Sequence, residues 1–213
     1  MEHELQYVYV GTLQPSVPTE LAGMTLAGSD RLSLTDTYFD TEDLALRNAG
    51  CTLRIRVGES GASPRLTWKG PSKRRRNGHK RRAEVELRVD VVPQTSDELE
   101  TMLRRFGLDR VLRKKAGVDT GLQPIGQLQS ERSRHHYVQG LHRLELTWDK
   151  LSFPRGPDKV WVEVEARSSR AHRYLSEADR QLRRLFADDL EPAKRGKVRE
   201  LCERLYPELV GAG

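Results

Sequence analysis

Charged residues stand two positions apart in five separate segments of this chain. Residues i and i+2 of a β-strand point to the same face of a sheet, so each segment would present its charges together. Apolar residues often lie between them, as Val164 does between Glu163 and Glu165. Each segment is therefore predicted to be a strand with one charged face. The five are Glu2-x-Glu4, Arg54-x-Arg56, Arg82-x-Glu84-x-Glu86, Arg132-x-Arg134 and Glu163-x-Glu165.

These charged faces constrain what they can surround. Carboxylates brought close together repel one another unless a cation lies among them, and arginines repel one another unless they meet anions. A divalent metal ion bound to a polyphosphate satisfies both groups at once. If the charged faces converge, the sequence predicts a space that binds such a complex. Any one pair alone is more often a solvated strand face.

Composition and length fit a folded protein with anionic ligands. The chain has 213 residues, 36% hydrophobic and 32% charged, and a net charge of +6. This length suits one domain, residues 1–213, and the charge favours anionic partners. No stretch is long and apolar enough to span a bilayer, so no membrane partner is expected. Cys51 and Cys202 lie far apart, so a reduced cytoplasmic setting is expected. Homodimer formation is left open.

The pattern of expected elements favours an α+β protein built on a closed eight-stranded antiparallel barrel. Strands are expected over 2–10, 31–40, 51–58, 65–69, 80–91, 128–139, 141–150 and 159–167. Helices are expected from Ser96 to Gly107, from Ala171 to about Ala187, and from about Gly196 onward. Many strands joined by short turns, with few helices between them, favour a closed barrel over a parallel sheet. The helices would flank it and form a C-terminal helical segment.

The order of these segments resembles the triphosphate tunnel metalloenzymes, also called the CYTH superfamily. That family opens with Glu-x-Glu-x-Lys, and this chain has Glu2-His3-Glu4-Leu5-Gln6. The matches run in order to about residue 196. The others are Tyr38-Phe39-Asp40-Thr41, Leu53-Arg54-Ile55-Arg56, Leu66-Thr67-Trp68-Lys69-Gly70, Arg82-Ala83-Glu84-Val85-Glu86, Arg132-Ser133-Arg134, Glu145-Leu146-x-x-Asp149, Val162-Glu163-Val164-Glu165 and Lys194-Arg195-Gly196.

The resemblance implies a role for each charged segment. It implies a tunnel that binds a triphosphate with Mg²⁺ or Mn²⁺, since hard oxygen ligands suit these ions. It implies catalytic roles for Glu2, Glu4, Arg56 and Lys69. The implied substrate-binding residues are Arg54, Arg56, Lys69, Arg82, Arg132, Arg134 and Lys194. The implied metal ligands are Glu2, Glu4, Glu84, Glu86, Asp149, Glu163 and Glu165, with the choice between Glu84 and Glu86 open.

One position departs from the family pattern. Gln6 stands where the family has a lysine, and a neutral amide cannot supply that positive charge. The expected consequences of this change are weaker binding, altered substrate choice, a changed pH optimum or loss of activity. The lysines that could replace the charge in space are Lys69, Lys114, Lys115 and Lys197.

The predicted function is a metal-dependent triphosphatase that acts on the terminal phosphoanhydride of tripolyphosphate or of a small organic triphosphate such as thiamine triphosphate. One alternative is a class IV adenylate cyclase, which forms cyclic AMP and pyrophosphate from ATP. Another is a polyphosphate- or nucleotide-binding module with weak catalysis. Nucleic-acid binding through the basic cluster at 73–82 is disfavoured, because that cluster contains no aromatic residue for base stacking.

Overall fold

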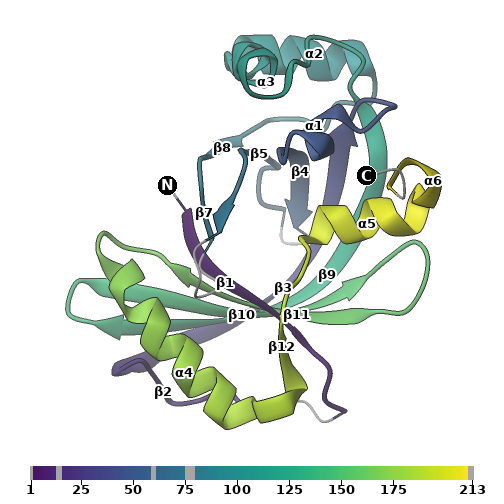
Figure 1. Ribbon diagram of the computed structural model, residues 1–213. Helices are drawn as coiled ribbons and strands as arrows, with labels where there is room; N and C mark the ends of the chain where they lie inside the picture. The colour runs from purple at the N-terminus through teal and green to yellow at the C-terminus, as the bar shows by residue number, and fades with distance from the viewer. Residues whose placement is uncertain (1, 13–15, 59–60, 75–79, 211–213) are drawn as a thin grey trace.

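The computed structural model describes residues 2–12, 16–58, 61–74 and 80–210. Its strands belong to one antiparallel sheet that curls into a nearly closed barrel with helices against its outer surface (Figure 1). The predicted α+β barrel is therefore confirmed. Residues 75–79 of the basic cluster expected at 73–82 lie outside the described residues.

The barrel uses strands that are distant in sequence. Neighbouring strands follow the order β7, β1, β11, β10, β9, β3, β4, β5 and β8, with β2, β6 and β12 added at its edges. The strands are β1 Glu2–Tyr9, β2 Glu20–Leu21, β3 Met24–Asp40, β4 Thr52–Gly58, β5 Arg65–Lys69, β6 Lys73–Arg74, β7 Lys80–Arg82, β8 Glu84–Arg88, β9 Gln123–Gln139, β10 His142–Ser152, β11 Lys159–Ala166 and β12 Leu190–Pro192.

The prediction of one continuous strand over 80–91 is wrong, because this segment divides at Ala83 into β7 and β8. β7 pairs with β1, where Arg82 lies opposite Glu2, and β8 pairs with β5, where Glu84 lies opposite Lys69. At the break, the Ala83 carbonyl accepts a 2.9 Å hydrogen bond from the Gly70 amide. One segment thus pairs with different neighbours at its two ends, so nine strands rather than the expected eight form the wall of the nearly closed barrel.

The helices follow the amphipathic pattern of the sequence, with one addition. As expected, Gly107 ends the helix that begins at Ser96. Its positive φ of 67° then turns the chain directly into a second helix, α3, which the sequence pattern did not predict. The 3-10 turns are η1 Ala171–Tyr174 and η2 Ala187–Asp189. The α-helices are α1 Ala45–Asn48, α2 Ser96–Arg105, α3 Leu108–Ala116, α4 Leu175–Phe186, α5 Lys197–Leu205 and α6 Pro207–Val210.

Two apolar cores lie on the outside of the barrel. Leu182 of α4 belongs to a buried cluster with Val162 and Val164 of β11. On another side, Leu103 of α2 and Trp68 of β5 belong to a second cluster. Figure 1 shows α4 and the α2–α3 pair against different parts of the barrel wall. Apolar burial outside the wall supplies the main stabilising term, so the inner face of the strands is free to be polar.

A third apolar cluster fills one end of the barrel. Leu151 and Trp161 lie two positions beyond Asp149 and Glu163 on their strands, and Leu128 lies four positions beyond Arg132. All three belong to one buried cluster with Leu201 and Cys202 of α5. Because strand residues alternate between faces, these side chains continue the inner face. Helix α5 and this cluster therefore close that end with apolar packing.

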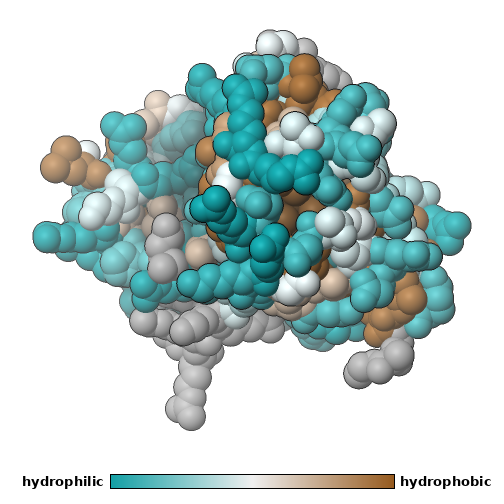
Figure 2. Space-filling model, turned by 90° about the horizontal axis from the view of Figure 1, so that it is seen from above, coloured by the Kyte–Doolittle hydropathy of each residue, from teal (hydrophilic) through white to brown (hydrophobic). Residues whose placement is uncertain are grey.

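The surface seen from above is mainly hydrophilic, with apolar side chains in small separate groups (Figure 2). Within the described part of the chain, no helix is both long and apolar enough to cross a bilayer.

Candidate functional site

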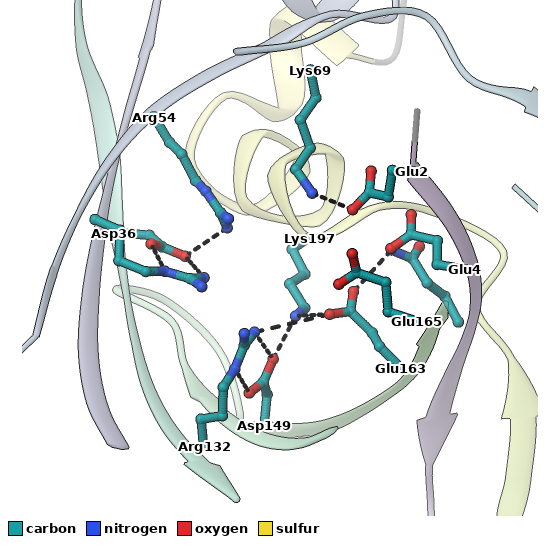
Figure 3. Close-up of polar contacts among 12 residues, drawn as sticks. Glu2, Glu4, Asp36, Arg54, Lys69, Arg132, Asp149, Glu163, Glu165 and Lys197 are labelled. Carbon is teal, nitrogen blue, oxygen red and sulfur yellow. Dashed lines mark hydrogen bonds and ion pairs between the residues drawn. The ribbon is translucent and has the colours of Figure 1, made fainter. Parts of the chain in front are cut away.

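The inner face of the barrel gathers the charged side chains of several strands (Figure 3). Strand alternation explains this arrangement, because Leu5, Val162 and Val164 face the outer core while their neighbours face inward. The residues drawn toward one another in Figure 3 are Glu2, Glu4, Asp36, Arg54, Lys69, Arg132, Asp149, Glu163, Glu165 and Lys197.

Glu2 is held by two basic side chains. Its carboxylate accepts hydrogen bonds from Lys69 Nζ at 2.6 Å and from Arg82 Nε at 2.6 Å. Lys69 also lies 3.1 Å from Glu84. Burial opposes ionisation of Glu2, but Lys69 and Arg82 outweigh that effect and lower its pKa to about 2. Glu2 is therefore a carboxylate throughout the neutral range.

Glu4 lies two residues further along the same strand. At this residue the effects that raise the pKa outweigh those that lower it. Its carboxylate accepts a 3.1 Å hydrogen bond from Arg82. Burial raises its pKa to about 7, with Glu2 and Glu163 adding to the increase and Arg82 opposing it. Glu4 therefore changes its charge near neutral pH in the ligand-free protein.

Asp149 forms the most deeply buried ion pair of the inner face. Arg132 donates to both of its oxygens, from Nε and Nη2, at 2.6 Å each. Lys197 Nζ donates to Asp149 at 2.6 Å and to Glu163 at 3.1 Å. Burial opposes ionisation of Asp149, but the charges of Arg132 and Lys197 outweigh it and hold the pKa well below its usual range. Asp149 is thus a permanent anion between two cations.

Asp36 of β3 also lies in the site, although the sequence analysis did not select it. It accepts two hydrogen bonds from Arg56, at 2.6 and 2.7 Å, and one from Arg54 at 3.1 Å. Despite burial, the charges of Arg54 and Arg56 hold the Asp36 pKa well below its usual range. This carboxylate fixes the direction of both guanidinium groups. The sequence could have indicated Asp36 only as an acid opposite the Arg54-x-Arg56 strand. That inference needs the register between β3 and β4, which the sequence does not give.

Gln6 occupies the next inward position of β1 and lies opposite Glu163 of β11. Its amide Nε2 donates a 2.8 Å hydrogen bond to Glu163. Lys197 donates to the other oxygen of the same carboxylate. A positive charge therefore stands beside Gln6, delivered from α5 rather than from β1.

Lys197 differs from the late basic residue selected from the sequence. Lys194 is exposed in the segment before α5, whereas Lys197 lies at the first position of α5 and reaches the carboxylates inside the barrel. The other lysines considered, Lys114 and Lys115, are exposed on α3. The spacing of basic residues in the sequence could not show which of them points inward.

The remaining predicted residues lie where the inner face becomes accessible to solvent. Side-chain exposure rises from 0% at Asp149 to 30% at Arg134 and 40% at Glu86. Arg134 donates to both oxygens of Asp30, at 2.8 and 3.1 Å, and Glu86 pairs with Arg65. These residues belong to the open part of the barrel.

Glu165 also lies toward this accessible part, opposite Glu4 of β1. Arg167 donates a 2.8 Å hydrogen bond to its carboxylate. Burial raises the Glu165 pKa above its ordinary value, and Arg167 opposes that change.

The carboxylates are chemically suited to a divalent ion but are separated by basic side chains. Among the residues that the structure describes, no three His, Cys, Asp or Glu side chains lie together as a ready metal cluster. Lys197 lies between Asp149 and Glu163, and Lys69 lies between Glu2 and Glu84. A metal ion could reach these oxygens if the lysines moved to another anion, and the phosphates of a ligand would provide one.

Comparison with known structures identifies the same fold in distant relatives. An adenylyl cyclase candidate from Hippeastrum, described as having dominant triphosphatase activity, is 20% identical, with a TM-score of 0.62 over 94% of this chain and 95% of its own. The PH1819 protein from Pyrococcus horikoshii OT3 is 18% identical, with a TM-score of 0.52 over 94% and 98%. The comparison with curated proteins found no significant match.

The family model for the CYTH domain matches residues 1–191. This range includes every strand of the barrel wall and all of the inward carboxylates described above. The chain belongs to the CYTH domain family.

Proposed function

We propose that this protein is a divalent-metal-dependent triphosphatase that hydrolyses the terminal phosphoanhydride of inorganic tripolyphosphate or of a small organic triphosphate such as thiamine triphosphate. The observation that carries the proposal is the alternation of guanidinium or ammonium groups with carboxylates on one enclosed face. Membership of the CYTH family and the triphosphatase activity described for the Hippeastrum protein support it.

Three arginines and two lysines are placed to bind the phosphate chain. Arg54, Arg132, Arg82, Lys69 and Lys197 each pair with an inward carboxylate. Arginine binds phosphate through a planar fork of donors, and hydrogen bonds between charged groups are about twice as strong as neutral ones. When a triphosphate enters, these cations can exchange a carboxylate oxygen for a phosphate oxygen without losing a charged partner.

The carboxylates released by this exchange would hold Mg²⁺ or Mn²⁺. Asp149, Glu163 and Glu165 form one donor set, and Glu2 and Glu4 with Glu84 or Glu86 form another. Bound there, the metal would neutralise charge on the phosphates and lower the pKa of water. The protein's own contribution is to position the phosphate chain and to compensate its charge, which is most of what phosphoryl transfer requires.

The closed end of the barrel favours a small substrate. Trp161, Leu151 and Leu201 are buried together beyond Asp149 and Glu163, so in this proposal the phosphate chain extends toward the more exposed Arg134 and Glu86. In this proposal a short triphosphate lies along the charged part of the inner face, between the apolar end and the accessible residues. A longer attached group would remain in the accessible part of the barrel.

Product analysis tests the function. Purified protein would be given tripolyphosphate, thiamine triphosphate and ATP in parallel with Mg²⁺ or Mn²⁺, with a chelator control for each. The proposal expects orthophosphate release that the chelator abolishes. Cyclic AMP with pyrophosphate would instead identify a class IV adenylate cyclase. Binding of tripolyphosphate without turnover would identify a polyphosphate-binding module.

A further inference from the structure

Two threonine hydroxyls on the inner face have no hydrogen-bond partner among the residues that the structure describes. Thr67 of β5 is 1% exposed and Thr147 of β10 is 3% exposed. Neither Oγ1 atom bonds to any residue that the structure describes. A buried polar group left without a partner costs about 1–3 kcal/mol, and the large majority of such groups are paired. Two in one polar space therefore require an explanation.

Strand alternation places both hydroxyls among the charged residues. Thr67 follows the outward Leu66 and comes two positions before Lys69, and it lies opposite Arg54 of β4. The Nε atom of Arg54 is also buried without a partner among the described residues. This part of the wall therefore offers two unused donors side by side.

Thr147 has an equivalent place on the other side of the barrel. It follows the outward Leu146, comes two positions before Asp149, and lies between Arg134 of β9 and Glu163 of β11. Thr67 lies on β5 and Thr147 on β10. Around the wall, these two strands are separated by β9, β3 and β4 in one direction and by β11, β1 and the β7–β8 segment in the other. The two threonines therefore come from opposite walls.

Packing alone does not account for these hydroxyls. Valine has almost the same shape as threonine and fits a strand equally well, without a buried polar atom to satisfy. Ser130 provides a contrast, because its hydroxyl is also unpartnered among the described residues but lies between the apolar Leu34 and Leu151. Of these three hydroxyls, those of Thr67 and Thr147 lie opposite charged residues of the proposed site on the neighbouring strands, whereas that of Ser130 lies opposite apolar residues on both sides.

We propose that Thr67 and Thr147 donate hydrogen bonds from opposite walls to phosphate oxygens of the bound triphosphate. This inference rests on the proposed function and adds two substrate-binding residues to it. A hydroxyl supplies a donor without adding charge, so it can lie beside Glu163 without competing for that carboxylate as a lysine does. The hydroxyls reach a partner only when the ligand is bound.

The experiment compares Thr67→Val and Thr147→Val with Thr67→Ser and Thr147→Ser. The exposed loop residue Thr120, changed to valine, serves as the matched control. Calorimetric titration would measure the Kd for tripolyphosphate with Mg²⁺, and thermal unfolding would measure the Tm without ligand. Each valine variant should bind at least about 10-fold more weakly, because a hydrogen bond to a charged group is worth about 1.5–3 kcal/mol. The serine variants keep the hydroxyl and should therefore bind more tightly than the valine variants, and Thr120→Val should bind as the wild type does.

The ligand-free Tm separates this role from a structural one. Each valine variant should unfold at or above the wild-type Tm, because it loses an unsatisfied polar group. Unchanged affinity in the valine variants would overturn the inference. If the ligand-free Tm of these variants were also lowered, the partner of the hydroxyl would be a structural water. A wild-type protein that fails to bind tripolyphosphate would overturn the proposed function as well.

Discussion

The inner and outer faces of the same strands have opposite chemistry. On β11, Glu163 and Glu165 face the ion pairs of the interior, whereas Val162 and Val164 are buried against α4. Most proteins place their apolar residues inside a sheet structure and their charges in water. Here two apolar clusters lie outside the barrel wall, and the interior carries charge except at the end closed by α5. The difference separates the residues that hold the fold from those proposed to perform the chemistry.

The largest expected effect comes from removing two inner carboxylates. Glu163→Ala with Glu165→Ala should abolish metal-dependent phosphate release, because one proposed metal site loses two of its three ligands. The fold should remain, since both side chains lie outside the apolar cores. Steady-state phosphate release and far-UV circular dichroism would measure the two effects. Retained turnover would show that the metal assignment is wrong.

Leu182→Ala makes the opposite change on the outer side. Leu182 is fully buried in the cluster between α4 and the barrel. Truncation of a buried leucine costs about 2–5 kcal/mol of stability. Denaturant unfolding should show this loss, while turnover of the folded protein at low temperature stays within about twofold of wild type. A large loss of turnover in a fully folded Leu182→Ala variant would contradict the claim that the outer face only stabilises the fold.

Asp36→Asn tests whether phosphate can replace an inner carboxylate. The change leaves Arg54 and Arg56 without their charged partner, and breaking a buried ion pair costs about 3–5 kcal/mol. Phosphate oxygens would supply the missing anion. The rise in Tm caused by tripolyphosphate should therefore be larger in this variant than in wild type. An equal or smaller rise would place the ligand away from these arginines.

A smaller effect concerns Gln6 and Lys197. Because Lys197 already places a cation beside Glu163, Gln6→Lys alone should change tripolyphosphate affinity by less than about threefold. Lys197→Ala should weaken binding, and adding Gln6→Lys to that variant should restore part of it. Calorimetric titration of the three variants measures this. If Gln6→Lys strengthens binding equally in both backgrounds, Lys197 does not replace the family lysine.

The smallest effect is a pH dependence of stability in the metal-free protein. The Glu4 pKa is raised from 4.5 to about 7, so between these values the folded state holds a proton that the unfolded state has lost. Its contribution to stability is full below pH 4.5 and is lost as pH rises through 7. The free energy of unfolding of wild type relative to Glu4→Gln should therefore fall over this range. A constant difference would contradict the assigned pKa.

Much of the barrel followed from the two-residue period of charge. The period marks which side chains share a face, so it indicates Glu2, Glu4, Arg54, Arg132 and Glu163, and the structure brings them to one space. Lys69 follows from the resemblance to the CYTH motifs rather than from the period. The same period concealed the break at Ala83, because Arg82, Glu84 and Glu86 continue the alternation across it.

Other features depend on contacts between distant segments. Asp36 is a single acid in its strand, and only the pairing of β3 with β4 brings it to Arg54 and Arg56. Lys197 lies on a helix, where neighbouring basic residues point in different directions. Its position depends on the packing of α5 against the end of the barrel. Local sequence spacing contains neither kind of information.

The most direct test of the central claim is the position of the bound ligands. Crystals grown with Mn²⁺ and tripolyphosphate would locate the metal by its anomalous scattering and the phosphate chain by its density. Manganese should lie among Asp149, Glu163 and Glu165, with phosphate oxygens on Arg54, Arg132 and Lys197. Metal and phosphate bound only on the outer surface, with the inner ion pairs unchanged, would contradict the account.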